Sequence, residues 1–291
     1  DFFELRTARN KNLITKQEQE KLRALRVGIA GLSVGNSAAL ALTLEGFETM
    51  RLADFDNLSL SNLNRIRGSI TQLGLNKTVM TARHIYELNP YAKLKLFSKG
   101  LPTKKELRRF IAGPPKLQLL IDEMDDVIMK IQLRKIARNL RIPVVSVADN
   151  GTNAVADIER FDLEPTRKIY HGLLGDIANK NLQNLDFSEK IKLISSMVGV
   201  EYVHSRMKQS VLEVGNTLYS WPQLGGAAML SGATLAYLAK KIALQERATS
   251  GKYDVNLDRI FNKDYDSSKS KQYRNRETKE FLVQQNRIFS S

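Results

Sequence analysis

Cysteine is absent from all 291 residues of the sequence. Its absence excludes disulfides, zinc sites with cysteine ligands, and any reaction step through a thiolate or thioester on this chain. Histidine is scarce as well: there are three, and no two share the spacing of metal ligands. We therefore expect no zinc. No signal peptide is visible in these residues, and a cytoplasmic location is the simpler interpretation.

Long hydrophobic spans are lacking too. One stretch, from Val214 to Ala239, contains no charged residue and is long enough to consider as a membrane span. However, it includes Pro222, Gly225 and several other small or polar residues. The pattern favours a buried helix over residues 223–243 that follows a turn, and we expect no membrane contact.

Acidic residues are outnumbered. The chain has 45 Lys and Arg against 31 Asp and Glu, which gives a formal net charge of +14. This excess is typical of a soluble, lysine-rich surface, but also of a protein with a polyanionic partner such as a nucleic acid, a nucleotide or an acidic protein. No motif for RNA or DNA binding stands out. Basic residues gather at Lys104-Lys105 with Arg108-Arg109, and at Lys130, Arg134, Lys135 and Arg138.

Short apolar runs alternate with helical stretches over the first 150 residues. The runs predict five strands, at Val27–Gly31, Thr49–Asp54, Lys93–Ser98, Leu117–Asp122 and Pro143–Val147. Helices are expected at Ser37–Glu45, at Lys77–Leu88, from the capping box Thr103–Glu106 onward, and at Asp126–Leu140. This alternation predicts an α/β fold with a doubly wound, mainly parallel sheet and helices on both faces.

The pattern changes after residue 150. Asn153–Phe161 is expected to add an antiparallel strand, Leu163–Leu182 a loop, and Ser188–Val198 and Val203–Val214 two helices. From Arg247 onward polarity rises and hydrophobic periodicity fades. We predict one domain over residues 1–246, with a helical lead-in over 1–25, and a polar tail or linker over 247–291.

Glycines are fewer than usual in the turn after the first strand, Gly31-Leu32-Ser33-Val34-Gly35-Asn36. A strand, a turn of small residues and a helix form a phosphate-binding order, because backbone N–H groups at a helix N-terminus attract anions. Gly31 would allow the tight turn, and Ser33, Gly35 and Asn36 would let the backbone approach a nucleotide. The usual Gly-x-Gly-x-x-Gly spacing is not met, so a purely structural turn stays an equal alternative.

Polar residues follow the second strand. Asp54 lies 23 residues after Gly31, where an acid in a nucleotide-binding sheet faces the ribose hydroxyls; the alternative is a loop-capping pair with Asp56. The run Ser61-Asn62-Leu63-Asn64-Arg65 could hold phosphate oxygens through its amides and guanidinium, or form a polar turn. Lys77 opens the next helix, where it would attract phosphate or remain solvated.

Acids also follow the fourth strand, in Asp122-Glu123-Met124-Asp125-Asp126. The carboxyl ends of parallel strands border the ligand crevice in such sheets. Carboxylates there suit Mg²⁺, a hard cation that prefers oxygen ligands and phosphate. The alternative is that Asp125 or Asp126 caps the following helix.

Together these motifs resemble the ThiF/MoeB/HesA and ubiquitin-activating superfamily, whose members adenylate a carboxylate with Mg·ATP. The resemblance runs from about Arg6 to Leu244 and is strongest from Arg51 to Lys77. It implies a Rossmann-like ATP-binding adenylation domain. The implied roles are ribose binding by Asp54, with Asp56 close to ribose or metal, triphosphate binding by Asn62, Arg65 and Lys77, and Mg²⁺ binding by Asp125. It also implies a homodimer, because Arg6-x-x-Arg9 looks like a lead-in whose second arginine, Arg9, reaches the partner's ATP site.

The chain departs from the family pattern at several positions. Ser33, Val34 and Asn36 stand where glycine is usual, Asp126 where Asn is common, and Lys130 where Arg is frequent. The thioester-forming cysteine and the zinc-binding cysteine pairs are both absent. A thioester relay is thereby excluded, whereas adenylation without one stays open.

The sequence therefore predicts an ATP/Mg-dependent adenylyltransferase that activates a small-molecule or peptide/protein carboxylate and releases pyrophosphate. Residues 150–220 would shape the acceptor side of its site. Two alternatives stay open. One is a non-catalytic scaffold that kept the fold, which the altered glycine loop favours. The other is a tRNA-modifying, dehydratase-type member of the superfamily, which the +14 charge favours.

Overall fold

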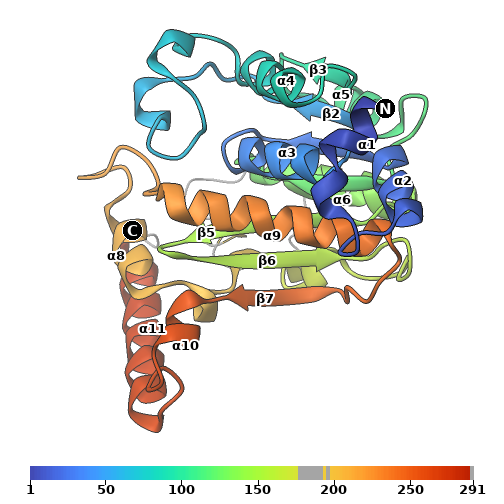
Figure 1. Ribbon diagram of the computed structural model, residues 1–291. Helices are drawn as coiled ribbons and strands as arrows, with labels where there is room; N and C mark the ends of the chain where they lie inside the picture. The colour runs from blue at the N-terminus through green and yellow to red at the C-terminus, as the bar shows by residue number, and fades with distance from the viewer. Residues whose placement is uncertain (176–192, 195–196, 289–291) are drawn as a thin grey trace.

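The computed structural model describes residues 1–175, 193–194 and 197–288. Its centre is a seven-stranded sheet in the order β3-β2-β1-β4-β5-β6-β7 (Figure 1). Five strands are parallel: β1 (Arg26–Ala30), β2 (Thr49–Ala53), β3 (Lys93–Phe97), β4 (Leu119–Asp122) and β5 (Val144–Asn150). Each overlaps a strand predicted from the sequence, and the mainly parallel, doubly wound sheet is confirmed.

The central strands form because their side chains are apolar on both faces. Val27, Ile29, Leu120 and Ile121 are fully buried, as expected for a parallel sheet that is covered on both sides. In the register of the sheet, Ala30 of β1 lies beside both Ala53 of β2 and Asp122 of β4. The carboxyl ends of these three strands therefore meet at one edge of the sheet.

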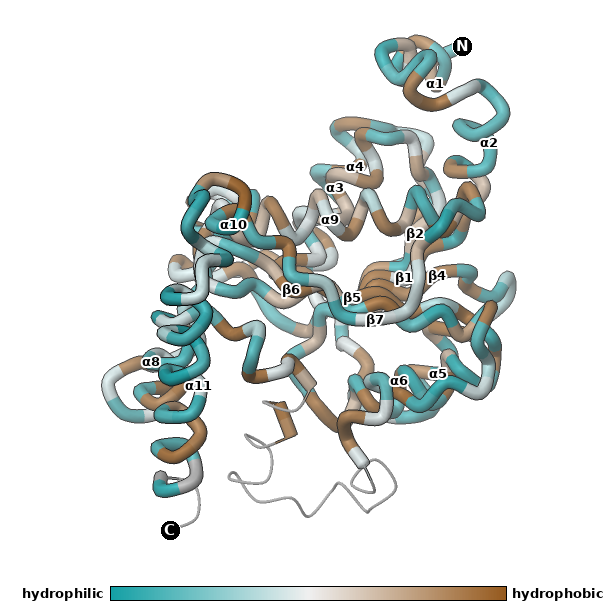
Figure 2. Tube along the Cα trace, turned by 90° about the horizontal axis from the view of Figure 1, so that it is seen from below, coloured by the Kyte–Doolittle hydropathy of each residue, from teal (hydrophilic) through white to brown (hydrophobic). Residues whose placement is uncertain are grey.

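Helices cover both faces of the sheet (Figure 2). On one face, α2 (Lys16–Ala24), α3 (Val34–Glu45), α4 (Lys77–Leu88) and α9 (Gly225–Ala243) enclose one hydrophobic core. On the other face, α5 (Lys104–Ala112) and α6 (Val127–Asn139) enclose a second core. The two-sided cover confirms the α/β class.

The buried helix α9 packs against α3 and against β5 and β6. A side-chain carbon at Gly232 would lie 2.5 Å from Cβ of Ser37, so the helices cross closely only because residue 232 is glycine. Gly226, one turn and a half earlier in α9, has no other group within 4 Å of such a carbon. None of the helices that the structure describes is both long enough and apolar enough to cross a bilayer.

The added antiparallel portion contains two strands, and only one of them was predicted. β6 (Asn153–Glu159) pairs with β5, and β7 (Gly251–Val255) pairs with β6. β7 lies in the stretch 247–291, for which we expected a polar tail or linker. Because it is a five-residue edge strand with Lys252 and Asp254 among its residues and no fully buried position, it leaves little hydrophobic signal.

The C-terminal stretch continues as α10 (Leu257–Phe261) and α11 (Ser268–Ile288). α11 projects away from the sheet and packs against α8 (Ser205–Glu213) (Figure 1). Two hydrogen bonds join the pair, from Ser205 to Glu277 at 2.5 Å and from Lys208 to Thr278 at 2.7 Å. α8 corresponds to the helix predicted over Val203–Val214, whereas the one predicted over Ser188–Val198 falls largely outside the described residues.

Short helices fill the remaining described segments. The lead-in contains α1 (Phe2–Arg6) and η1 (Ala8–Asn10) before α2. The segment between β2 and α4 contains η2 (Leu60–Asn62) and η3 (Ile70–Gln72), and the segment before α8 contains η4 (Ile169–Gly172) and η7 (Val200–Tyr202).

A buried arginine connects the parallel and antiparallel parts of the sheet. The fully buried guanidinium of Arg134 donates to Asp122 at the end of β4 and to Glu159 at the end of β6, the latter at 2.5 Å. Its Cζ also lies 4.0 Å from the ring centroid of Tyr170. Removing one partner of such a buried pair leaves an uncompensated charge, so this contact fixes the position of β4 and of the residues that follow it.

Glu123, the next residue after β4, carries an unusual carboxyl group. Its Oε1 accepts a hydrogen bond from the Val147 N–H at 2.8 Å. Burial raises the pKa of Glu123 to about 8, and the nearby Lys130 ammonium only partly opposes this effect. The carboxyl is therefore largely protonated at neutral pH.

The α9–α3 contact leads to a prediction with a control in the same helix. Gly232→Ala should lower the free energy of unfolding by about 1–3 kcal/mol, because its methyl group overpacks a tight crossing. Gly226→Ala adds the same group in open space and should leave stability unchanged or raise it by up to about 1 kcal/mol. Urea denaturation followed by circular dichroism measures both, and equal effects would contradict the tight crossing.

The Glu123 carboxyl leads to a prediction about pH. Its pKa rises from an ordinary 4.5 to about 8 in the folded protein, so the folded state holds a proton that the unfolded chain has released between these values. The free energy of unfolding should therefore fall as pH rises through this window, by at most about 1.4 kcal/mol per pH unit. Glu123→Gln should remove this part of the pH dependence. Parallel stability profiles for the two proteins in urea denaturation would show that the carboxyl is ionised in the fold.

Candidate active site

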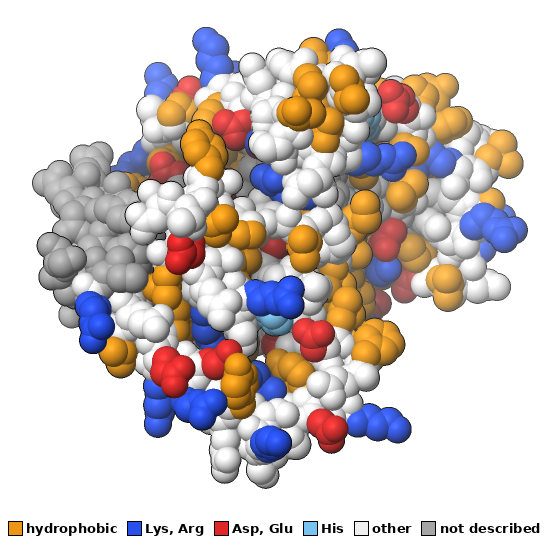
Figure 3. Space-filling view, turned by 90° about the vertical axis from the view of Figure 1, so that its left-hand side faces the viewer, with side chains coloured by type: hydrophobic (Ala, Val, Ile, Leu, Met, Phe, Trp, Pro, Cys, Tyr) orange, Lys and Arg blue, Asp and Glu red, His pale blue; other side chains and the backbone are white. Residues whose placement is uncertain are grey.

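The predicted residues from the ends of β1, β2 and β4 meet at the carboxyl edge of the sheet. Figure 3 views the molecule from this end, where charged side chains lie among hydrophobic ones. Four parts of the chain lie around this edge: the turn after β1, the segment from Asp54 to Arg65, the first residue of α4 and the segment from Glu123 to Asp126. We call the region that they border the crevice. They can meet there because the parallel strands all end on the same side.

The turn after β1 is tight at Gly31. This residue has φ +88°, and a side-chain carbon on it would lie 2.2 Å from the carbonyl oxygen of Glu123. The backbones at the ends of β1 and β4 therefore approach each other closely. Gly35 is similarly constrained, since a side-chain carbon there would lie 2.9 Å from Ile29.

The N-terminus of α3 lacks a side-chain cap. Ser33 occupies the cap position without accepting a hydrogen bond from the first turn of the helix. Its hydroxyl oxygen instead accepts from Arg65 Nε at 3.1 Å. The backbone N–H groups at the start of α3 thus lie beside a guanidinium, a combination that favours an anion.

The Asn36 side chain is turned away from this anion site. It is completely buried, and its Nδ2 donates to Thr81 Oγ1 of α4 at 2.8 Å. The side chain of Asn36, one of the residues predicted to bind the nucleotide, therefore joins α3 to α4. Ser33 lies in the turn as predicted, whereas Gly35 belongs to the first turn of α3, which begins at Val34 and not at the predicted Ser37.

Asp54 connects two loops through backbone hydrogen bonds. One carboxylate oxygen accepts from the Leu32 N–H at 2.7 Å and the other from the Asp56 N–H at 2.8 Å. Burial raises the pKa of Asp54, whereas the charge of Lys77 and the two N–H donors lower it. The carboxylate lies at the crevice wall, with lone pairs left for a further donor such as a hydroxyl.

Lys77 and Asp56 form an ion pair across the crevice wall. The Lys77 ammonium lies 2.8 Å from Asp56 Oδ2, and Lys77 is 6% exposed although its partner is open to solvent. Their proximity agrees with the prediction that both belong to one site. In this structure, however, the two side chains neutralise each other.

Arg65 connects the segment after β2 to the turn after β1. Besides Ser33, its guanidinium donates to Asn64 Oδ1 at 2.9 Å and to the Ser61 carbonyl at 3.3 Å. Burial lowers the pKa of Arg65, and the carboxylates of Asp149 and Asp125 raise it. Asn62 is used locally instead: its Oδ1 accepts from the Ser59 N–H at 3.1 Å and caps the short helix η2.

The two acids after β4 have different roles. Asp126 caps α6, with its Oδ1 accepting from the Met129 N–H at 3.0 Å. Asp125 is exposed, and within the described residues no hydrogen bond or ion pair engages its carboxylate. The structure thus separates the capping alternative, which fits Asp126, from a free carboxylate at Asp125.

This donor set fits Mg²⁺ bound together with phosphate. The described residues contain no group of three or more His, Asp or Glu placed to hold a metal. A single free carboxylate beside an anion site suits Mg²⁺, which keeps several water ligands and is usually held by one or two carboxylates and phosphate oxygens. Asp125 would supply that carboxylate.

Arg9 lies far from the crevice of its own chain. It is an exposed residue of η1, in a lead-in that contacts the C-terminal end of α3. Arg6 donates to the Thr43 carbonyl at 2.7 Å, and Gln19 donates to the Glu45 carbonyl at 2.7 Å. The crevice lies at the other end of this 12-residue helix, about 18 Å away along its axis.

Three residues at the crevice were missed by the sequence analysis. Asp149 of β5 accepts from Ser231 Oγ at 2.6 Å and from Gln223 Nε2 at 3.2 Å. The Gln223 carbonyl in turn accepts from Asn64 at 2.8 Å, which connects this cluster to the segment of Arg65. The rule that pointed to Asp54 and Asp125, an acid at the carboxyl end of a parallel strand, could have identified Asp149 if β5 had been extended past Val147.

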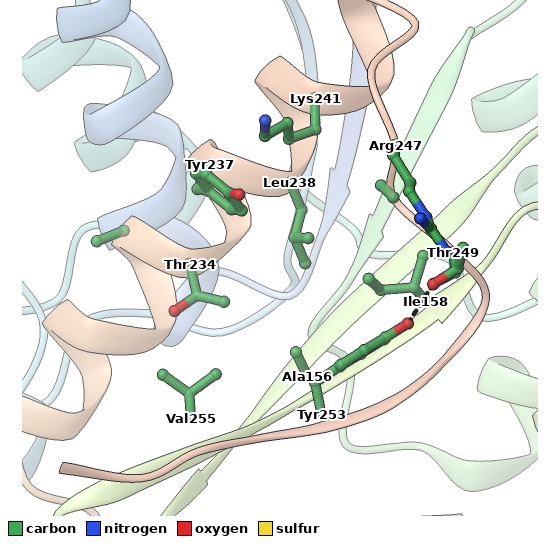
Figure 4. A pocket seen from close by; sticks show the side chains of 12 residues that line it. Ala156, Ile158, Thr234, Tyr237, Leu238, Lys241, Arg247, Thr249, Tyr253 and Val255 are labelled. Atoms are coloured by element: carbon green, nitrogen blue, oxygen red, sulfur yellow. Dashed lines mark hydrogen bonds between the residues drawn. The ribbon is translucent and has the colours of Figure 1, made fainter. Parts of the chain in front are cut away.

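A separate cavity of about 650 Å³ lies between α9 and the strands β6 and β7 (Figure 4). Its walls are mostly apolar, with Tyr237, Leu238 and Tyr253 among them. None of the predicted site residues lines it. Apart from Arg9, the residues predicted to bind phosphate or metal lie at the crevice, which is therefore the candidate active site.

Curated relatives cover different shares of the chain. This chain is 40% identical over 258 residues to an uncharacterised protein, MT1398, of Mycobacterium tuberculosis. The match covers 88% of this chain and 35% of that protein. A molybdopterin-synthase adenylyltransferase of Haemophilus influenzae is 26% identical, over 62% of this chain and 72% of that one. A tRNA threonylcarbamoyladenosine dehydratase of Bacillus subtilis is 27% identical, over 64% and 76%. The chain thus spans about a third of the length of the mycobacterial relative.

Solved structures share the fold. A crystal structure of the protein PaaA matches with a TM-score of 0.61 and 20% identity, over 88% of this chain and 76% of that one. The tRNA N6-threonylcarbamoyladenosine dehydratase of E. coli matches with a TM-score of 0.61 and 18% identity, over 84% and 96%. E. coli MccB with ATP matches with a TM-score of 0.57 and 17% identity, over 82% and 66%.

The match to a family model covers most of the chain. The model of the ThiF family matches residues 7–247, which include every strand from β1 to β6, helix α9 and all of the crevice residues described above. The shared fold, the curated relatives and the match to the family model agree with one another. The chain belongs to the ThiF family.

Proposed function

We propose that the chain is an ATP- and Mg²⁺-dependent adenylyltransferase that activates a carboxylate and releases pyrophosphate, without a cysteine relay. The observation that carries this proposal is the position of Arg65. Its guanidinium bonds to Ser33 beside the uncapped start of α3, and it lies in the electrostatic field of the free Asp125 carboxylate. This arrangement would join an anion site to a metal-binding carboxylate. Adenylyltransferases among the relatives support the same reaction type.

The reaction needs positive charge more than acid–base catalysis. A carboxylate oxygen attacks the α-phosphorus of ATP, a new O–P bond forms, and the bond to the β-phosphate oxygen breaks to release pyrophosphate. Two anions must approach each other, so Arg65, Lys77 and the N–H groups of α3 would bind the phosphates and offset their repulsion. Mg²⁺ held at Asp125 would stabilise the leaving pyrophosphate.

Asp54 and Asp56 would have different roles in nucleotide binding. The Asp54 carboxylate is held in place by two backbone N–H groups and would accept a hydrogen bond from the ribose. Asp56 holds Lys77 at 2.8 Å. Binding of the triphosphate would have to compete with this ion pair for the ammonium group. Asn62 would contribute indirectly, by capping η2 in the segment that contains Arg65.

The substrate would be a small-molecule or peptide carboxylate, and the acyl-adenylate would pass directly to an amine, hydroxyl, sulfur or amide. Because the chain has no cysteine, no thioester on it can intervene. The acceptor would enter from the side of residues 150–220 and Asp149. Dependence on ATP makes the cytoplasm the proposed location.

The enzyme would act as a homodimer with Arg9 in trans. Arg9 is exposed and lies at the opposite end of α3 from its own crevice. In an antiparallel pair of copies, each Arg9 would approach the partner's phosphates. A two-fold arrangement would make both sites equivalent.

A non-catalytic scaffold is the second candidate. The observation in its favour is that Lys77 is occupied by Asp56 and that the Asn36 side chain is buried against α4. Failure to bind ATP in calorimetry would favour this role over catalysis.

Asp125 and Asp126 provide a matched test of the catalytic proposal. Asp125→Asn should slow carboxylate-dependent pyrophosphate–ATP exchange by about 100-fold or more and raise the Mg²⁺ concentration needed, because it removes the free carboxylate. Asp126→Asn should retain exchange, because asparagine caps a helix as well as aspartate does. Equal rates for the two variants would overturn the metal role of Asp125. No exchange by the unmodified protein with a broad panel of carboxylates would overturn the proposed reaction.

Mixing variants tests the role of Arg9. Arg9→Ala and Lys77→Ala should each be inactive alone. Their mixture should regain up to about a quarter of the activity, because half of the dimers are mixed and each contains one intact site. Arg9→Ala mixed with the double variant of Arg9 and Lys77 is the control and should stay inactive. Full activity of Arg9→Ala alone would contradict a role in trans.

A further inference from the structure

Half of the chain's excess positive charge lies in one short stretch. Residues 93–116 contain eight Lys and Arg and a single acid, a net charge of +7 out of +14. These residues form β3, the turn after it, α5 and the loop before β4. All eight basic side chains are exposed, namely Lys93, Lys95, Lys99, Lys104, Lys105, Arg108, Arg109 and Lys116. We call this surface the β3–α5 face.

The bases of the β3–α5 face have no acidic partners. Within the described residues none of the eight forms an ion pair, although bases elsewhere on the surface do, such as Lys16 with Glu4 at 3.4 Å and Arg259 with Asp266 at 3.2 Å. The one acid of the stretch, Glu106, bonds to Thr103 at the start of α5. The charges of this face are therefore not neutralised by the chain itself.

Side-chain contacts join the strand and the helix into one surface. Lys95 of β3 and Arg109 of α5 both lie over the ring of Phe97, with the Lys95 ammonium 5.8 Å and the Arg109 guanidinium carbon 5.6 Å from its centroid. Two further basic residues, Lys135 and Arg138, belong to α6, which packs beside α5 (Figure 2). Burial and the nearby charges of Lys104 and Arg138 lower the pKa of Lys135 there.

A hollow of about 220 Å³ lies at one end of this face, where β1, β2 and β3 begin. Four bases line it, Arg26, Arg51, Lys93 and Lys95, and no acid is among its lining residues. Arg51 is fixed by the carbonyls of Gly113 and Pro115, each at 2.6 Å, and Arg26 by the Lys116 carbonyl at 2.8 Å. The hollow is thus a built cationic site, with room for several water molecules or one phosphate group.

We propose that the β3–α5 face binds the phosphodiester backbone of a nucleic acid duplex, with one phosphate in the hollow lined by Arg26, Arg51, Lys93 and Lys95. The proposal does not depend on adenylation. It rests on eight unpaired cations, the cationic hollow and the continuity between them. Sequence-independent binding to duplexes uses this chemistry, since most of its affinity comes from cations that displace the counterions of phosphates.

An acidic protein is the weaker alternative for this face. Protein interfaces are depleted of lysine and rely on exposed aromatic or aliphatic anchors at their centre. Here six of the eight bases are lysines, and Phe97 at the centre is only 9% exposed. Bases of single-stranded nucleic acid would need exposed aromatic rings for stacking, which also favours a duplex.

Charge reversal with a matched control tests the proposal on the full chain. Fluorescence anisotropy would measure binding of labelled duplexes of about 20 base pairs, one of RNA and one of DNA, at about 50–200 mM KCl. The test variant carries Lys104→Glu, Lys105→Glu and Arg108→Glu on α5. The control carries Lys263→Glu, Lys269→Glu and Lys279→Glu, which are exposed residues of the C-terminal stretch and change the net charge equally. A further variant, Lys93→Gln with Lys95→Gln, tests the hollow.

We expect the unmodified protein to bind at least one duplex with an affinity that falls steeply with salt. The α5 variant should lose at least about tenfold in affinity, and its slope of log affinity against log salt should be shallower by about 3 for three lost phosphate contacts. The hollow variant should also lose affinity, and the control should change by less than about threefold. Comparison of the two duplexes decides which nucleic acid is preferred. The proposal is overturned by equal losses in the α5 and control variants, by no binding at the lowest salt, or by tighter binding of a polyglutamate peptide.

Discussion

The close approach of the β1 and β4 backbones at Gly31 determines the geometry of the crevice. A side-chain carbon at Gly31 would lie 2.2 Å from the Glu123 carbonyl oxygen, so the two chain segments can pass only because this position is glycine. From this contact the chain turns directly into α3, whose uncapped N-terminus then faces the ends of the neighbouring strands. Ser33 is thereby placed within reach of Arg65, and the Leu32 N–H within reach of Asp54. The site depends on backbone proximity first and on its charged side chains second.

The charges in the crevice are balanced before any ligand is considered. Lys77 is paired with Asp56, and Arg65 lies in the field of Asp125 and Asp149. Burial also raises the pKa values of Asp54, Glu123 and Asp149, which limits how much negative charge the walls carry. A polyanionic substrate must therefore compete with internal carboxylates for the cations. This competition would favour a ligand that brings its own divalent cation, because the metal neutralises the acids that the phosphates displace.

The sequence was sufficient for the parallel sheet and for most of the crevice. Buried parallel strands give apolar runs, and the carboxyl ends of such strands meet, so Asp54 and Asp125 could be assigned to one edge without coordinates. Arg65 and Lys77 follow no strand end, and the resemblance to the superfamily assigned them to the same site. β7 was missed because an edge strand is partly solvated and short. The Asp149 cluster was missed because its hydrogen bonds join residues 74 and 82 positions apart, which no local pattern encodes. The Asn36 side chain was unpredictable for the same reason, since its partner Thr81 lies on another helix.

The excess positive charge is distributed unevenly between the crevice and the β3–α5 face, which the overall composition does not show. A net charge of +14 suggests a basic protein throughout, yet the crevice is close to internal balance and half of the excess lies on the β3–α5 face. Nucleotide binding therefore does not account for the excess. The two regions approach each other along β3: Lys99 is followed by Gly100, where a side-chain carbon would lie 2.9 Å from Phe55, the residue between Asp54 and Asp56. A polyanion lying along the face from the hollow would thus end beside the wall that carries the proposed ribose-binding acid.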